Sequence, residues 1–232
     1  MRRMGRRTCD TRNVRISETT IRSPMAAPTD PTAAETTRGL VLVLSGPSGV
    51  GKTTVAQHVL ARYGGSFSVS ATTRAPTAKE RDGVDYHFID EQTFQAWIDD
   101  GRFIEFAQVF GRSWYGTLRA PVEHALASGE LIVLDIDVQG AEQVHEQVPD
   151  MVGVFLLPPS MDELLHRLRS RGRDTEEAIQ RRFATAKAEM ERAARNGVYD
   201  ATIVNDDLVK AQRELDALVG SRLAGRHGRR AG

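Results

Sequence analysis

The stretch from Leu40 to Leu60, LVLVLSGPSGVGKTTVAQHVL, places a glycine-rich segment between a continuous apolar run and a second, periodic apolar segment. The run LVLVLS predicts a buried strand over residues 40–45, and the later period predicts a helix over residues 52–62. Residues 46–53, GPSGVGKT, fit the pattern G-x-x-x-x-G-K-[ST] in the strand–loop–helix context that the pattern requires. This feature therefore predicts an α/β core with the loop at one end of a strand.

The residue types of this loop suit a polyphosphate. Glycines permit backbone angles that a side chain would forbid, so the main-chain N–H groups can turn inward around an anion. The following helix adds its positive N-terminus, Lys52 can reach the β- and γ-phosphates, and the Thr53 hydroxyl can ligate Mg²⁺. The expected ATP-binding residues of the loop are Gly46, Pro47, Ser48, Gly49, Val50, Gly51, Lys52, Thr53 and Thr54. The motif indicates nucleotide binding but not the reaction, since GTPases, ATPases and small-molecule kinases share it.

Strand and helix signals alternate along the rest of the chain. Short apolar runs predict further strands over residues 66–70, 131–137, 152–157 and 200–205. Helical patterns lie over residues 91–100, 117–128, 138–147, 160–170, 175–196 and 206–219. Capping-box spacing marks two helix starts, Ser160 with Glu163 and Asp174 with Glu177. The alternation predicts a P-loop NTPase fold, in which helices flank a parallel sheet.

Three segments depart from this alternation. Residues 71–117 are rich in Arg, Thr, Gly and aromatic residues and predict a small mixed or antiparallel insert. Residues 1–38 have no apolar period and predict a disordered extension, in which Met25 is a plausible alternative start. Residues 221–232 hold four arginines and no acid, and predict a flexible basic tail. The domain itself is expected to span residues 39–220.

The charge distribution argues against nucleic acid as a partner. The formal net charge is zero, but residues 39–220 hold 19 basic and 27 acidic residues and so carry about −8. The single cysteine excludes a disulfide within the chain and suits a reducing compartment. No apolar run approaches the ~18 residues that span a bilayer, and the N-terminus lacks the apolar middle of a signal peptide. We therefore expect a cytoplasmic protein with no membrane or nucleic-acid partner.

A second anion site is predicted in SVSATTRAPTAKERDGVDYHFI, residues 68–89. A kinase that acts on a small phosphate acceptor must hold two anionic groups in line. Arg74 can grip a phosphate with two N–H groups, and the Tyr86 hydroxyl can donate to the same phosphate. This segment therefore indicates the acceptor side of a phosphotransferase.

Nine motifs then carry a family resemblance: GPSGVGKTT, SVSATTR, DGVDYHF, FIEFA, WYGT, LDIDVQG, LPPS, RLRSRG and IVNDDL, in that order. On these motifs the chain resembles guanylate kinase from about residue 40 to residue 215. The resemblance implies ATP-dependent phosphorylation of GMP to GDP, with ADP as the second product, in purine nucleotide metabolism. It also implies Mg²⁺ with ATP, dGMP as a further acceptor, a GMP-binding insert at about 71–117 and a lid at about 167–190.

The resemblance assigns residues to the acceptor nucleotide. The implied contacts of the GMP phosphate are Arg74, Tyr86 and Tyr115, and those of the guanine base are Ser70, Glu105, Thr117 and Asp137. A carboxylate accepts from guanine's ring and exocyclic N–H donors but would face a lone pair on adenine. A buried carboxylate left unpaired costs ~1–3 kcal/mol, enough for roughly tenfold to hundredfold discrimination. Without the resemblance, Glu105 would be interpreted as a solvated acid at a helix end.

The segment LIVLDID, residues 131–137, is an apolar run that ends in two acids. Ligands gather at the carboxyl ends of strands in open α/β sheets, so Asp135 is expected to support Mg²⁺ with Thr53, directly or through water. Asp137 faces the same side and could reach the base. The alternative is that both acids only begin the next helix as caps.

Positioned cations are the expected catalytic device, because phosphoryl transfer spreads negative charge over several oxygens. The implied catalytic residues are Lys52 and the lid arginines Arg167, Arg171 and Arg182. In a chain with 27 arginines and four lysines, a solvated basic face is the alternative for the lid residues. Asn205, at the end of the last strand, could contact adenine.

One position departs from the family pattern. The family usually has a second phosphate-binding arginine in TTRxPR, where this chain has Thr77. We expect Arg81 or Lys79 of the same loop to substitute for it.

Two other functions stay open on the sequence: a protein-interaction module that has lost catalysis, and a P-loop kinase for another small acceptor. The presence of Lys52 and Thr53 argues against the first, and Glu105 with Asp137 argues against the second. The sequence does not indicate an oligomeric state.

Overall fold

The structure is a computed structural model that describes residues 39–109, 113–170 and 175–228. Every described residue belongs to one compact unit of the chain, Glu35–Gly232. The predicted extension over residues 1–38 therefore lies outside the described part of the chain.

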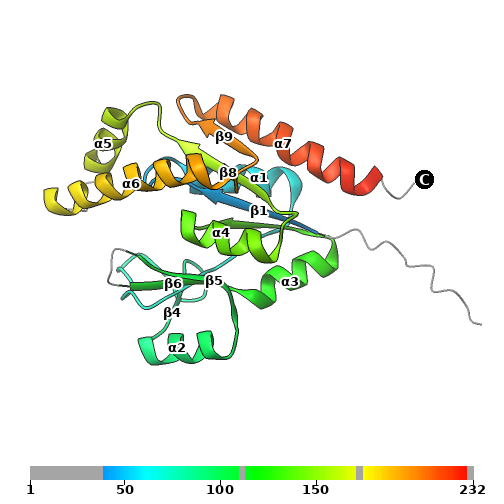
Figure 1. Ribbon diagram of the computed structural model, residues 1–232, viewed down its shortest axis with the longest axis horizontal. Coiled ribbons are helices and arrows are strands. Elements are labelled where there is room, and N and C mark those ends of the chain that lie inside the picture. Colours follow the sequence, from blue (N-terminus) through cyan, green and yellow to red (C-terminus); the bar gives the residue numbers. More distant parts are fainter. Residues whose placement is uncertain (1–38, 110–112, 171–174, 229–232) are drawn as a thin grey trace, which may run out of the picture. The chain divides into compact units, whose positions relative to one another are not determined.

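A five-stranded sheet forms the centre of this unit (Figure 1). Its strands are β1 (Leu40–Ser45), β2 (Ser66–Phe67), β7 (Leu131–Asp135), β8 (Val152–Leu157) and β9 (Ala201–Val204). Their order is β2-β7-β1-β8-β9, and every pairing is parallel. β1 lies in the middle and is buried along its whole length, as its uninterrupted apolar run predicts.

Helices cover both faces of this sheet. They are α1 (Lys52–Tyr63), α7 (Leu208–Gly228), α3 (Arg119–Ser128) and α4 (Val138–Gln147). Leu42 of β1 packs in one cluster with residues of α1 and α7, whereas Val43 packs in another with residues of α3 and α4. Figure 1 shows the two pairs on opposite sides of the sheet. The predicted α/β fold with flanking helices is confirmed.

Residues between β2 and α3 form a second sheet, of order β4-β3-β6-β5. Its elements are β3 (Ala71–Thr72), β4 (His87–Phe88), β5 (Phe103–Val109) and β6 (Ser113–Leu118), with helix α2 (Glu91–Asp99). β5 and β6 pair antiparallel, and β3 and β4 pair parallel, so the insert is mixed. Its small core includes Phe94 stacked on Phe103 at 4.5 Å between ring centroids.

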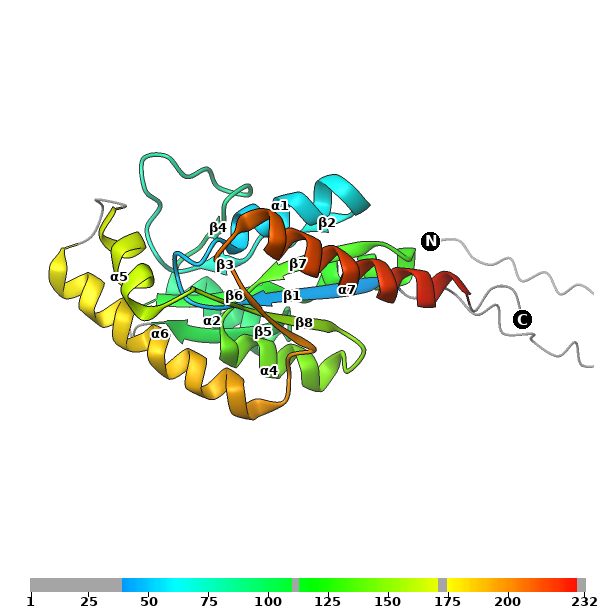
Figure 2. The same cartoon turned by 90° about the horizontal axis from the view of Figure 1, so that it is seen from above.

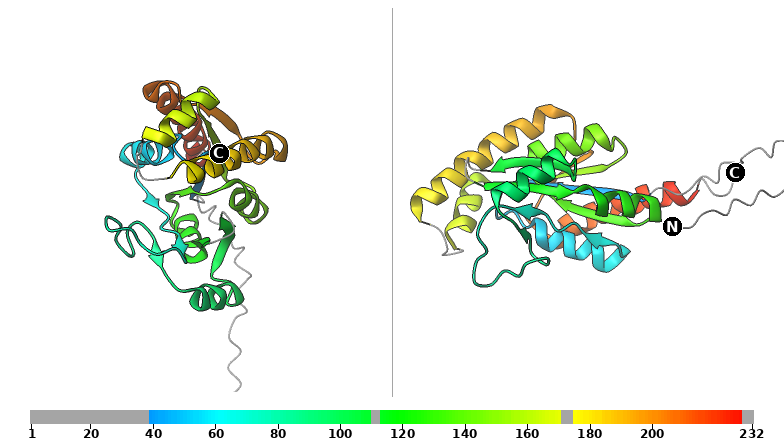
Figure 3. Two further views of the ribbon diagram at one scale, coloured as in Figure 1. Left: turned by 90° about the vertical axis from the view of Figure 1, so that its left-hand side faces the viewer. Right: turned by 90° about the horizontal axis from the view of Figure 1, so that it is seen from below.

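Two further helices, α5 (Met161–Ser170) and α6 (Glu176–Asn196), pack against each other through Leu164, Leu168 and Ile179. Figure 2 shows this pair at the end of the sheet toward which the arrow of β1 points. The left view of Figure 3 faces that end, with the insert below and the helix pair above. The carboxyl ends of the parallel strands therefore lie between the insert and the helix pair.

Several predicted boundaries are wrong, among them the start of the helix predicted over 117–128, because residues 117 and 118 belong to β6. β2 ends at Phe67 because, after Ser68 N donates to Val133 O (2.9 Å), the chain leaves the parallel sheet to join the second one. The strand predicted over 131–137 ends at Asp135, since the Asp137 carboxylate caps α4 by accepting from Gly140 N (2.8 Å). Helix α6 is capped by the Thr175 hydroxyl, and Asp174 lies outside the described residues.

The predicted flexible tail begins too early, because α7 continues to Gly228. Arg222 pairs with Asp200, Leu223 packs partly buried against the main core, and Arg226 donates to the carbonyls of Gly39 and Asp150. The arginines lie four residues apart on one helix face, which holds this last part of α7 against the domain. Within the described residues, no helix is long and apolar enough to cross a bilayer.

Candidate active site

The loop between β1 and α1 has a backbone that requires glycine. Gly46 and Gly51 have φ of +139° and +102°. A Cβ on Gly46 would lie 2.3 Å from the carbonyl oxygen of Leu156, and one on Gly51 would lie 2.5 Å from Nδ2 of Asn205. The loop thus packs closely against β8 and against the end of β9, with no room for side chains at these positions.

Lys52 lies beside an acid from the neighbouring strand. Its Nζ donates to Gly46 O (2.7 Å) and lies 3.6 Å from Oδ1 of Asp135. The parallel register pairs Leu44 of β1 with Asp135 of β7, which places the end of β7 at the base of the loop. Burial raises the pKa of Asp135, and the Lys52 ammonium opposes that rise. Thr53 and Thr54 are exposed on the first turn of α1.

Asn205 is buried against the phosphate loop. Its side-chain Nδ2 donates to Val50 O (2.8 Å), and its main-chain carbonyl accepts from Nη2 of Arg167 (3.3 Å). The side chain therefore fixes the shape of the loop, a role that the sequence did not indicate. The expected contact with adenine stays a prediction.

Glu105 is a buried acid of the insert and not a solvated helix end. Thr117 lies opposite it on β6, and Oγ1 of Thr117 donates to Oε1 of Glu105 (2.5 Å). Oε2 of Glu105 lies so close to Gly140 that a Cβ there would be 2.6 Å away. Burial raises the pKa of Glu105 to about 7, and the charge of Asp137 adds to this rise. The structure thus brings an acid of the insert to the N-terminus of α4, which Asp137 caps.

Two glutamines of α4 fix β5 at this position. Gln143 accepts from Phe106 N through Oε1 (3.1 Å) and donates to Phe106 O through Nε2 (2.9 Å). Gln147, one turn later, donates to Ile104 O. These contacts hold the backbone on both sides of Glu105. The sequence did not indicate these contacts, although the spacing of four residues places both glutamines on one face of the helix.

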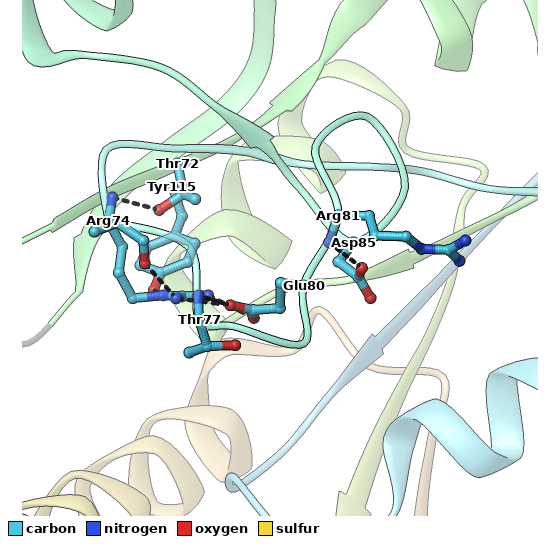
Figure 4. Close-up of polar contacts among 8 residues, drawn as sticks. Thr72, Arg74, Thr77, Glu80, Arg81, Asp85 and Tyr115 are labelled. Atoms are coloured by element: carbon cyan, nitrogen blue, oxygen red, sulfur yellow. Dashed lines mark hydrogen bonds and ion pairs between the residues drawn. The ribbon is translucent and has the colours of Figure 1, made fainter.

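Three predicted phosphate ligands meet in the insert, and Figure 4 shows two of them, Arg74 and Tyr115. Nε of Arg74 donates to the Tyr115 hydroxyl (3.1 Å), and the guanidinium lies 5.5 Å from the centroid of the Tyr86 ring. The rings of Tyr86 and Tyr115 meet edge to face at 5.8 Å. Burial raises the pKa of Tyr86 to about 12, so its hydroxyl stays a hydrogen-bond donor at neutral pH. Ser70 precedes this cluster, next to β3.

Of the two expected substitutes for the missing arginine, Arg81 does not lie at this cluster. The Arg81 side chain points away from Arg74 in Figure 4, and the Arg81 main chain donates to Asp85 (2.8 Å). Lys79 is exposed. The loop residue that meets Arg74 is an acid, Glu80, at 2.8 Å.

The lid arginines are described only in part. Arg167 of α5 donates to Glu163 (2.7 Å) as well as to Asn205, so it lies near the end of β9. Arg182 is half-buried on α6, and Arg171 lies outside the described residues. Arg169 pairs with Glu176 and thereby links α5 to α6.

The fold and the site define a P-loop phosphotransferase with an insert that carries a second group of polar side chains. A family model described as guanylate kinase matches residues 38–222. A guanylate kinase of Myxococcus xanthus is 47% identical over 78% of this chain and 86% of its own length. One of Anaeromyxobacter dehalogenans is 48% identical over 82% of this chain and 84% of its own. A crystal structure of guanylate kinase from Anaplasma phagocytophilum superposes with a TM-score of 0.62 at 31% identity, covering 81% and 87% of the two chains. The chain belongs to the guanylate kinase family.

Proposed function

We propose that the protein transfers the γ-phosphoryl group of ATP to GMP and releases ADP and GDP. Membership of the guanylate kinase family supports this reaction. The observation that carries the choice of acceptor is the buried Glu105, bonded to Thr117 and set against the N-terminus of α4 beside Asp137. No comparison favours an interaction module or a kinase for another acceptor.

Two carboxylates and two hydroxyl groups form the proposed base site. Ionised Glu105 accepts hydrogen bonds from the ring N–H and the exocyclic amine of guanine, and Asp137 lies on the same side. Adenine would turn a lone pair toward Glu105 and leave a buried acid unpaired. Ser70 and Thr117 supply hydroxyl groups nearby.

The proposed reaction needs no strong base. An oxygen of the GMP phosphate is already anionic; it forms the new bond to the γ-phosphorus while the bond from that phosphorus to the β–γ bridging oxygen breaks. Lys52, with Arg167, Arg171 and Arg182, stabilises the charge that spreads over the transferring group. Arg74, Tyr86 and Tyr115 hold the acceptor phosphate.

The donors at the phosphate loop fit a magnesium ion. The Thr53 hydroxyl and the Asp135 carboxylate are oxygen ligands, and Mg²⁺ takes few protein ligands when phosphates supply the others. When bound, the ion neutralises charge on the β- and γ-phosphates of ATP. Asp135 also orients Lys52, 3.6 Å away. We place this activity in the cytoplasm, in purine nucleotide metabolism.

The test is ADP release in a coupled assay with ATP, Mg²⁺ and one acceptor at a time: GMP, dGMP, AMP or UMP. We expect release with GMP and dGMP at a kcat/KM at least about tenfold above that with AMP or UMP. No release with any acceptor would favour the interaction module. A preference for AMP or UMP would favour the other kinase.

A further inference from the structure

The guanidinium of Arg74 is bound by an acid of its own loop. Nη1 and Nη2 of Arg74 donate to Oε2 and Oε1 of Glu80 at 3.0 and 2.8 Å, a two-pronged contact. Nη1 also donates to Ala75 O (2.8 Å), and Nε is engaged by the Tyr115 hydroxyl. A planar guanidinium offers one such edge for the two oxygens of a phosphate when its Nε is already bonded. Glu80 occupies that edge.

The Glu80 carboxylate is held as an anion. Oε2 of Glu80 also accepts from Thr77 N (2.8 Å), and Glu80 N donates back to Thr77 O (3.1 Å), which closes a short turn. The Glu80 side chain is about a fifth exposed, and the contact with Arg74 lowers the pKa of Glu80 to about 2. It is therefore fully ionised at neutral pH. A guanidinium edge and a main-chain N–H are also donors that suit phosphate oxygens.

The charges around Arg74 make Glu80 a competitor of the incoming acceptor phosphate. The phosphate of GMP carries nearly two negative charges at neutral pH. Thr77 stands where the family usually has a second arginine, and the Arg81 side chain points away (Figure 4). With Glu80 in place, the Arg74–Glu80 pair has no net charge and attracts the acceptor phosphate less than an unpaired Arg74 would.

We infer that Glu80 acts as an internal stand-in for the acceptor phosphate: it occupies Arg74 in the empty site and is displaced, with its loop, when GMP binds. The inference rests on the proposed function. It makes acceptor binding a competition between two anions for one arginine. A ligand without a phosphate leaves the Arg74–Glu80 contact in place, so the competition weakens the binding of GMP but not that of guanosine.

The test compares Glu80→Gln and Glu80→Ala with a matched control, Asp85→Asn. Asp85 is an acid of the same loop that accepts from Arg81 N, and Figure 4 draws no hydrogen bond or ion pair between it and Arg74. Calorimetry gives the Kd of GMP and of guanosine for each variant, and steady-state rates give the KM of GMP and of ATP. We expect both Glu80 variants to bind GMP about three- to tenfold more tightly. In these variants GMP no longer has to break a partly exposed ion pair, which contributes ~1 kcal/mol. Guanosine binding, the KM of ATP and the control should change by less than about twofold.

Unchanged or weaker binding of GMP in folded Glu80 variants would overturn the inference. Weaker binding would assign Glu80 to orienting Arg74, and unchanged binding would leave it a surface contact. Equal tightening in Asp85→Asn would also overturn it, because loss of any loop charge would then suffice. Failure of the proposed function is distinct: the unmodified protein would then neither bind GMP nor release ADP with it.

Discussion

Oε2 of Glu105 and the Cα of Gly140 lie so close that a methyl group on Gly140 would sit 2.6 Å from that oxygen. Glu105 belongs to the insert and Gly140 to the first turn of α4, so this contact joins the insert to the core of the domain. It also sets Glu105 beside the helix cap Asp137, whose charge contributes to the raised pKa of Glu105. The carboxylates of Glu105 and Asp137 are thereby both available to one nucleobase.

We predict that Gly140→Ala raises the KM of GMP by about tenfold while the protein stays folded. The new methyl group must push the end of the Glu105 side chain, which can move at an expected cost below ~2 kcal/mol. Gly225→Ala in α7 is the control, because a Cβ there meets nothing within 4 Å and should stabilise the helix by ~0.5–1 kcal/mol. Thermal unfolding and steady-state kinetics measure both effects. An unaltered KM in Gly140→Ala would show that the position of Glu105 does not matter for GMP.

The pH dependence of GMP binding should report Glu105. Its carboxyl must lose a proton to accept from guanine, and the pKa of about 7 means that the KM of GMP rises as pH falls below 7. The acceptor phosphate titrates near pH 6 as well, but it does so equally in Glu105→Gln. The ratio of the two KM values should therefore change by up to about tenfold per pH unit below 7. A ratio that is flat from pH 5.5 to 8 would contradict the assignment.

Glu105 should also make the stability of the fold depend on pH. Its contribution to stability is larger at low pH, where GMP binds less tightly. The pKa of Glu105 is raised in the folded state from 4.5 to about 7, so its contribution to stability is full below about pH 4.5 and is lost as pH rises through 7. We expect Glu105→Gln to raise the free energy of unfolding at pH 8 by ~1–3 kcal/mol and to change it little at pH 4.5. Denaturant titrations at the two pH values measure this. Equal effects at both would place the carboxyl in a solvated environment.

Replacement of Lys52 should abolish turnover without unfolding the protein. Lys52 lies at the phosphate loop between Gly46 O and Asp135, and we expect Lys52→Ala to lower kcat at least about 100-fold. Lys210→Ala, which breaks an exposed contact with Asp206, is the control and should keep full activity. Retention of more than a tenth of kcat in Lys52→Ala would exclude a catalytic role for this lysine.

Asn205 should affect the binding of ATP, because it fixes the shape of the phosphate loop. Asn205→Ala leaves Val50 O without the hydrogen bond from Nδ2, and we expect a loss of ~1–3 kcal/mol of stability and a several-fold rise in the KM of ATP. Asn196→Ala removes a hydrogen bond to Glu142, away from the loop, and should leave the KM of ATP unchanged. If Asn205→Ala instead raises the KM of GMP alone, the proposed role in shaping the loop is wrong.

Short-range patterns predicted the strands β1 and β8 and the helix α4 to the residue, because apolar runs and helical periodicity are local. The glycine-rich loop was predictable for the same reason. Contacts between distant segments were not. The pairing of Gln143 with Phe106 and the contact of Asn205 with Val50 depend on how the insert and β9 meet the core. The contact of Glu80 with Arg74 was not predicted either, because the sequence does not show which side chains of one loop meet.

The most direct test of the account is the ratio of kcat/KM for GMP to that for AMP, measured with the unmodified protein and with Glu105→Gln. The account predicts a ratio of at least about tenfold to hundredfold in favour of GMP, which falls at least about tenfold in the variant. A ratio near one in the unmodified protein, or a ratio that Glu105→Gln leaves unchanged, would contradict the claim that this buried acid selects guanine.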